Sequence, residues 1–286
     1  MLNRLKQQIP SNLRSLSGAS REHARVEKTG TFREKESYGL IDRPNYAYGI
    51  LRAADLARFA GKKRVTVCEC GVATGNGLMN MVELAEAVHR VTGVEIRVVG
   101  LDSGEGLPIV DGYRDHPELW SPGDFTMTNK EDLRRRIGDK AELIFGDIAH
   151  TVDGFVASLD ESCPLGFLSI DVDIYSGSKS ALRSLLGAAE LYTPALSIYC
   201  DDVQFFFANR WCGELRAIEE FNEENAMRKI DIDRSLPGRR ADRTAPWYDA
   251  MFACHILDHP LRSSAHARGK MSIEEHYAFM KESSLF

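Results

Sequence analysis

Three aspartates stand directly after two strands that we expect to be neighbours in one sheet. Asp171 follows a strand predicted over 166–170, and Asp201 and Asp202 follow a strand predicted over 195–200. A right-handed crossover helix would link these strands, so their carboxyl ends should meet at one edge of the sheet, about 4.8 Å apart. Carboxylates that close repel one another unless protons or a cation offset their charge. Because magnesium prefers oxygen ligands, we predict that the three aspartates bind Mg²⁺; the alternative is three solvated residues.

A glycine-rich turn near residue 70 carries a fourth carboxylate. Residues 67–77 read Val-Cys-Glu-Cys-Gly-Val-Ala-Thr-Gly-Asn-Gly, with Glu69 two positions before Gly71. A β-branched strand precedes the turn, and apolar residues at helical spacing follow it until Gly93, which together indicate a nucleotide-binding corner. A carboxylate there suits a ligand with an amino group and would repel a pyrophosphate, which favours S-adenosylmethionine (SAM) over a dinucleotide. We expect SAM contacts from Glu69, Gly71, Gly75 and Asn76; the alternative for Glu69 is a strand-end residue exposed to water.

Two further strand ends supply the remaining predicted cofactor contacts. A strand over 96–102 ends in Asp102, which would reach both ribose hydroxyls, with Ser103 beside it. A strand over 142–145 precedes Asp147 and Ile148, which we expect to meet the adenine amino group and ring. Asp171 is also predicted to contact the cofactor. Simple turn chemistry is the alternative for Asp102, Asp147 and Ile148.

Methyl transfer to an alcohol would also require a route for the hydroxyl proton. The pKa of water is near 15.7 and that of Asp near 3.9, so outright proton transfer would cost on the order of 16 kcal/mol. A metal-bound hydroxyl is far more acidic. We therefore predict Asp173, on the same rim, as the general base. His150 is the reserve candidate, although a rim histidine without a role is commoner.

Strand and helix patterns alternate along the chain and should position these residues. Helices are predicted over 46–60, 76–92, 128–137 (opened by a Thr128–Glu131 capping box), 178–191 (capped by Ser176 or Ser178) and 214–226. Two final strands, 229–233 and 251–257, have no helix between them. The pattern predicts an α/β fold, a doubly wound, Rossmann-like sheet of seven strands with the last strand antiparallel.

We divide the chain into an arm (1–45), a catalytic domain (46–260) and a C-terminal helical appendage (261–286). Residues 1–36 carry eight Lys or Arg and four Glu, a net charge of +4 that leaves −10 for the rest. The arm is expected to fold over the active site, to pack on another subunit in a possible homo-oligomer, or to be a solvated tail. The long segments 104–128 and 235–249 are expected to cover the site and to face the substrate.

Overall composition excludes several classes of partner. The net charge of −6 argues against nonspecific nucleic-acid binding. The sequence has no run of 18 apolar residues and no signal-peptide core, so we expect no membrane partner and a cytoplasmic location. The six cysteines follow no secreted framework and are expected to be reduced.

Several motifs, in the same order, make the chain resemble the class I SAM-dependent methyltransferases, and more narrowly the macrocin-type sugar O-methyltransferases of natural-product biosynthesis. The matching segments are 69–78, 100–108, 120–125, 170–176, 200–202, 211–213 and 217–221. The resemblance implies a magnesium site at Asp171, Asp201 and Asp202, with Asp173 as base. It also implies SAM contacts through Glu69, Gly71, Asp102 and Asp147. The chain departs from the family at Gly104, usually an aromatic, and at Val203, often Tyr.

The function expected is methyl transfer from SAM to a hydroxyl of a polyhydroxylated small molecule, most simply the sugar part of a natural product. The main alternative is an NAD(P)-dependent short-chain dehydrogenase, because Tyr175-x-x-x-Lys179, with Ser162 upstream, fits its catalytic residues. That reading leaves Glu69 and the rim aspartates unexplained. A third reading, a SAM-binding protein without turnover, is disfavoured by the intact aspartates.

Overall fold

The computed structural model describes residues 11–110, 112–263 and 272–282, and the described chain contains one seven-stranded sheet. The strands are β1 (Arg64–Cys70), β2 (Glu95–Asp102), β3 (Glu142–Phe145), β4 (Leu165–Ile170), β5 (Tyr192–Cys200), β6 (Arg228–Ile232) and β7 (Met251–Ile256). Their spatial order is β3-β2-β1-β4-β5-β7-β6. The first five strands are parallel, and β7 runs antiparallel to both β5 and β6. The predicted doubly wound sheet with a reversed last strand is therefore confirmed.

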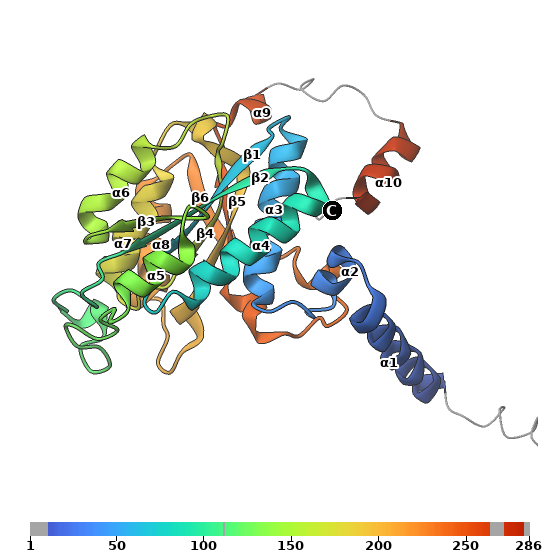
Figure 1. Cartoon of the computed structure of the whole chain (residues 1–286), viewed down its shortest axis with the longest axis horizontal. Coiled ribbons are helices and arrows are strands. Elements are labelled where there is room, and N and C mark those ends of the chain that lie inside the picture. Colours follow the sequence, from blue (N-terminus) through green and yellow to red (C-terminus); the bar gives the residue numbers. More distant parts are fainter. Residues whose placement is uncertain (1–10, 111, 264–271, 283–286) are drawn as a thin grey trace, which may run out of the picture.

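Helices cover both faces of this sheet (Figure 1). They are α3 (Pro44–Phe59), α4 (Asn76–Thr92) and α5 (Lys130–Ile137), and, on the opposite face, α6 (Ile148–Ala157), α7 (Tyr175–Leu182) and α8 (Gly213–Glu224). Each set packs on its own apolar core. All six residues of β4 are buried, as expected for a parallel strand covered on both faces. The sheet thus forms a rigid base for the residues at its carboxyl edge.

Two predicted helix caps are wrong, and a contact distant in sequence explains one of them. α7 begins at Tyr175, after an N-cap at Ile174, because the Asp115 carboxylate accepts the Ser176 backbone N–H (2.8 Å) and so supplies the cap. α7 also ends at Leu182, before short 3₁₀ turns at Arg183–Leu185 and Ala189–Leu191, instead of continuing to residue 191.

The other wrong cap is that of α5. This helix follows Asn129, and no side chain caps it, so the predicted Thr128 capping box is absent. By contrast, the C-terminal helix α10 (Ile273–Glu282) has a capping box: Glu275 accepts the Ser272 backbone N–H (2.7 Å), and the Ser272 hydroxyl accepts the Glu275 backbone N–H (3.1 Å).

The described part of the arm is helical and contacts the domain at its second helix. α1 (Ser11–Thr29) points away from the sheet, and α2 (Phe32–Ser37) lies beside α3. Arg33 pairs with Asp55 of α3 (2.6 Å), and buried Glu36 pairs with Arg240 of the β6–β7 connection. Residues 1–10 of the predicted arm, and 264–271 and 283–286 of the predicted appendage beyond α9 (Pro260–Ser263), lie outside the described residues. None of the described helices is long and apolar enough to cross a membrane.

Candidate active site

A cleft of about 880 Å³ opens at the carboxyl edge of the parallel strands. It is lined by the turn after β1, by the ends of β2, β3, β4 and β5, and by the long segment that begins at residue 103. Nine predicted site residues line it: Gly71, Asp102, Ser103, Asp147, Ile148, Asp171, Asp173, Asp201 and Asp202. Four others are not among the lining residues: Glu69, Gly75, Asn76 and His150. The sheet therefore brings together the predicted metal ligands and most of the predicted cofactor contacts.

The glycine turn fits closely between neighbouring strands. Gly71 has φ +86°, and its N–H donates to the Leu101 carbonyl (2.9 Å). A Cβ at Gly71 would overlap the Asp171 carbonyl oxygen, and a Cβ at Gly75 (φ +88°) would overlap the Leu133 side chain. Only glycine satisfies both the conformation and the space at these positions. The turn thereby places bare backbone on the cleft wall, as a close cofactor contact requires.

Glu69 lies behind this turn. The residue is buried, accepts a hydrogen bond from the Tyr46 hydroxyl (2.6 Å), and lies under Gly77 at the start of α4. Ser169 in turn donates to the Tyr46 oxygen (2.9 Å). Burial raises the pKa of Glu69 to about 8, although the Tyr46 hydrogen bond opposes the shift. The alternative of a water-exposed Glu69 is wrong, and its Tyr46 partner, 23 residues upstream, was not predicted from sequence.

Asp102 and Asp147 both bind backbone N–H groups. Asp102 accepts from Val72 (2.7 Å), Ala73 (2.8 Å) and Gly104 (2.5 Å), which ties the glycine turn to the end of β2. About one of its four carboxylate acceptor positions is left for a ligand. Asp147 is the N-cap of α6, where its carboxylate accepts the Ala149 N–H (2.8 Å). Both carboxylates therefore bind backbone N–H groups of nearby turns and also line the cleft.

His150 lies outside the cleft. Its side chain is 83% exposed, and its Nδ1 is 3.9 Å from an Asp147 carboxylate oxygen. The structure thus separates the reserve base candidate from the aspartates of the rim.

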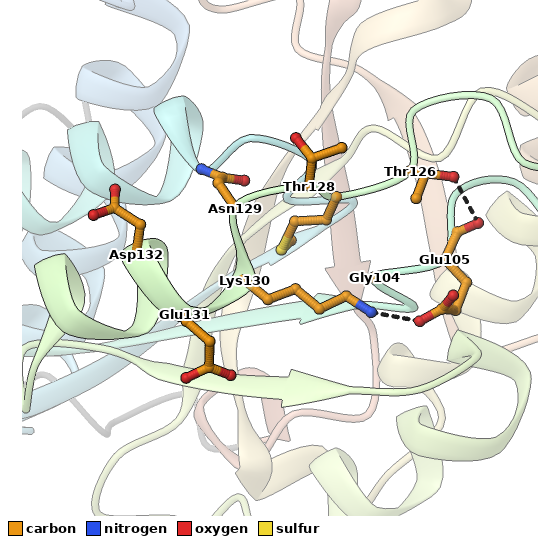
Figure 2. A pocket seen from close by; sticks show the side chains of 9 residues that line it. Gly104, Glu105, Thr126, Thr128, Asn129, Lys130, Glu131 and Asp132 are labelled. Carbon is orange, nitrogen blue, oxygen red and sulfur yellow. Dashed lines mark hydrogen bonds and ion pairs between the residues drawn. The ribbon is translucent and has the colours of Figure 1, made fainter.

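A lysine occupies the space beside Gly104. The Lys130 side chain of α5 lies where a Cβ on Gly104 would stand, and it pairs with Glu105. Figure 2 shows this ion pair crossing over Gly104, beside a shallow hollow formed by 126–132. Lys130 also lies over the Phe145 ring, 5.8 Å from its centroid. Of this pair, Glu105 lines the cleft and Lys130 does not.

Three carboxylates gather at the ends of β4 and β5. Asp171, Asp173 and Asp202 each present an oxygen, and these oxygens all lie within 4.8 Å of one another. Burial, with the charges of neighbouring aspartates, raises the pKa of each of the three to about 7. Asp201 lines the cleft next to them but accepts a hydrogen bond from the Tyr199 hydroxyl. The compact cluster thus includes the predicted base, Asp173, in place of the predicted ligand Asp201.

A fifth acidic residue, Glu214, lies beneath this cluster and was not predicted from sequence. It comes from the first turn of α8, is buried, and accepts the Asp202 backbone N–H (3.1 Å). Its other oxygen has no hydrogen-bond partner, and burial raises its pKa well above the usual range. The sequence does show an acidic residue after a glycine at the start of a helix. Acidic residues at that position more often cap the helix or face solvent, so the pattern alone does not indicate a buried carboxylate.

The donor set fits a hard divalent cation. The cluster offers carboxylate oxygens only, and one oxygen of Asp202 is buried without a hydrogen-bond partner. Unpaired buried carboxylates are costly, and burial followed by the charges of the neighbouring aspartates raises the pKa values of the three. A bound cation would offset both effects. Oxygen-rich sites of this kind suit Mg²⁺.

Aromatic side chains border the outer part of the cleft. Trp120 and Phe125 line it, and Trp120 is 6.0 Å from the ring of Phe205 in the segment after β5. Phe125 is 55% and Ile109 79% exposed, although both line the cleft. An acceptor entering here would meet an apolar surface.

The residues of the dehydrogenase alternative do not converge on the cleft. Tyr175 and Lys179 both bind the carboxylate of Glu220 (2.5 and 2.8 Å), and Ser162 is exposed beside Asp160. None of the three lines the cleft. The antiparallel β7 between β5 and β6 also differs from the 3-2-1-4-5-6 strand order of dinucleotide-binding sheets.

Comparison with known proteins gives structural matches alone: no family model matches the chain, and no curated protein matches its sequence. The O-methyltransferase NovP is 16% identical, with a TM-score of 0.50 over 74% of this chain and 79% of NovP. CalS11, a calicheamicin methyltransferase, is 16% identical, with a TM-score of 0.45 over 88% of this chain and 95% of its own. At this identity the likeness to NovP concerns the fold. With the strand order, it shows that the chain has the Rossmann-like fold of the class I methyltransferases.

Proposed function

We propose that the protein is a SAM-dependent, Mg²⁺-dependent O-methyltransferase that acts on a hydroxyl of a polyhydroxylated small molecule, most simply the sugar part of a natural product. The observation that carries this proposal is the carboxylate cluster, which lies on the wall of the same cleft as the glycine turn. The fold shared with NovP, an O-methyltransferase, supports it.

Cofactor binding is assigned to the turn and to the strand ends around it. SAM, when bound, supplies an electrophilic methyl group on its sulfonium. Gly71 allows close backbone approach, while Asp102 and Asp147 offer acceptor positions for hydroxyl and amino groups. Glu69 adds a carboxyl group behind the turn, and its ionised form would suit a cationic ligand better than a pyrophosphate.

Proton removal is assigned to the rim aspartates. A divalent cation at the cluster would supply Lewis acidity that lowers the pKa of an acceptor hydroxyl. Asp171 and Asp202 belong both to the predicted ligand set and to the observed cluster, with Asp201 as the proposed third ligand. Asp173 is the proposed base, because its carboxylate lies beside those of Asp171 and Asp202. Its backbone is left-handed (φ +61°) and no longer extended like that of β4.

The cleft wall favours an acceptor without phosphate. Among its described lining residues there is no Lys or Arg to bind an anionic group, whereas Ile109, Trp120 and Phe125 offer apolar contact. We therefore expect a neutral hydroxylated acceptor with an apolar part.

Calorimetric titrations with S-adenosylhomocysteine and with NADPH test the proposal directly. Heat of binding is expected for S-adenosylhomocysteine and none for NADPH. With an accepted hydroxylated substrate, EDTA should abolish transfer and Mg²⁺ restore it. Binding of NADPH alone would instead favour the dehydrogenase.

A further inference from the structure

Glu214 is a buried carboxylate without a cationic partner among the described residues. The Glu214 residue is 2% exposed, and the only hydrogen bond recorded for its side chain comes from the Asp202 backbone N–H (3.1 Å). No described Lys, Arg or His forms an ion pair with it. The charges that it meets are those of Asp202, Asp171 and Asp201.

The contact joins α8 to the turn that carries the cluster. Asp202 belongs to the 3₁₀ turn Asp201–Gln204 directly after β5, and the side chain of its N-cap residue, Cys200, makes no capping hydrogen bond. Glu214 therefore fixes the backbone of Asp202 from below, while one Asp202 carboxylate oxygen stays buried and unpartnered. A second oxygen, on Glu214 itself, is also buried without a hydrogen-bond partner.

We propose that Glu214 is a positioning residue for the cation: by accepting the Asp202 amide it holds the Asp202 carboxylate toward Asp171. This inference rests on the proposed cation site. It gives the start of α8 the role of holding a cation ligand in place, whereas the glycine turn and the strand ends supply the cofactor contacts and the ligands themselves. Residues that orient metal ligands typically change metal affinity about 10- to 100-fold when they are removed.

Binding of Mn²⁺, followed by electron paramagnetic resonance of the free ion, tests the inference without an acceptor. Glu214→Ala should weaken Mn²⁺ affinity by about 10- to 100-fold. Glu214→Gln keeps an oxygen at the same distance and should recover most of the affinity. Glu223→Gln, an exposed acidic position on the same helix, is the matched control and should bind as wild type does.

Unchanged Mn²⁺ affinity in folded Glu214→Ala would overturn the positioning role. If that variant does not fold, Glu214→Asp, which is shorter by one methylene, should show the same loss, and wild-type affinity there would be equally contrary. Failure of the wild-type protein to bind Mn²⁺ would instead overturn the cation site itself, so the two failures are distinguishable.

Discussion

Asp173 and Asp201 flank the same two aspartates but have different surroundings. Asp173 lies in the compact cluster with a left-handed backbone, whereas Asp201 accepts a hydrogen bond from Tyr199. If Asp173 is the base, its loss should affect proton removal. If Asp201 is the third ligand, its loss should affect cation binding. The two roles can therefore be separated by experiment.

Asp173→Asn should lower kcat by about 10²- to 10⁴-fold, the usual contribution of a general base, and leave Mn²⁺ binding nearly intact. Asp201→Asn should weaken Mn²⁺ binding, and both variants should bind S-adenosylhomocysteine as wild type does. Turnover numbers and Mn²⁺ titrations of the two variants show which aspartate is the base and which is the cation ligand. The reverse pattern would exchange the two assignments.

The raised pKa values of the cluster predict a pH-dependent stability. Asp171, Asp173 and Asp202 have pKa values of about 7 in the folded, cation-free protein and near 3.8 when unfolded. The folded state therefore binds more protons between these values, so this contribution to stability is fully present below about pH 4 and is lost as the pH rises through about 7. Mg²⁺ binds the ionised carboxylates and should offset this loss.

Denaturant unfolding from pH 4.5 to 8, in EDTA and in Mg²⁺, measures the effect. The gap in the free energy of unfolding between the two conditions should widen with pH. A gap that is constant or absent over this range would show that the cluster does not bind the cation.

Among the described residues, the Tyr46 hydroxyl donates the one hydrogen bond that the side chain of buried Glu69 accepts. Tyr46→Phe should lower the free energy of unfolding by about 1–3 kcal/mol, because it leaves a buried acceptor unsatisfied. Tyr277→Phe, at an exposed position, should change it by less than about 0.5 kcal/mol. Equal effects of the two substitutions in urea unfolding would contradict the importance of the Tyr46–Glu69 pair.

At the scale of elements, the glycine turn depends on the end of β4 for its shape. Gly71→Ala places a Cβ on the Asp171 carbonyl oxygen in a left-handed conformation, so it should reduce S-adenosylhomocysteine affinity strongly and lower the melting temperature. Gly61→Ala has a similar φ (+72°) with open space around it and controls for backbone strain alone. Calorimetry and thermal melts compare the two. Equal losses of affinity and melting temperature in both variants would mean that the close contact between Gly71 and the residue after β4 has no role.

The sequence predicts the strands well because the central parallel strands are rich in apolar and β-branched residues and are ended by turn residues. The ends of β4 and β5 thus locate Asp171 and Asp202, and the turn after β1 locates Gly71. What sequence does not reveal depends on contacts between distant segments. Asp115 caps α7, Tyr46 binds Glu69, and Glu214 supports Asp202. None of these pairs follows from a periodic pattern.

At the scale of the whole molecule, the second helix of the arm is fastened to the catalytic domain. α2 joins the domain through the Arg33–Asp55 and Glu36–Arg240 pairs, and no described residue before Gly71 lines the cleft. A covering role over the cleft or a contact with another subunit therefore stays a prediction for the arm. The loops beyond the carboxyl edge, with Trp120 and Phe205, are better placed to meet an acceptor.

Anomalous diffraction from crystals grown with Mn²⁺ and S-adenosylhomocysteine would show whether cation and cofactor share the cleft. We expect a manganese peak bonded to Asp171 and Asp202, with the cofactor product lying along the glycine turn in the same cleft. A peak elsewhere, or a cofactor product bound away from these carboxylates, would contradict it.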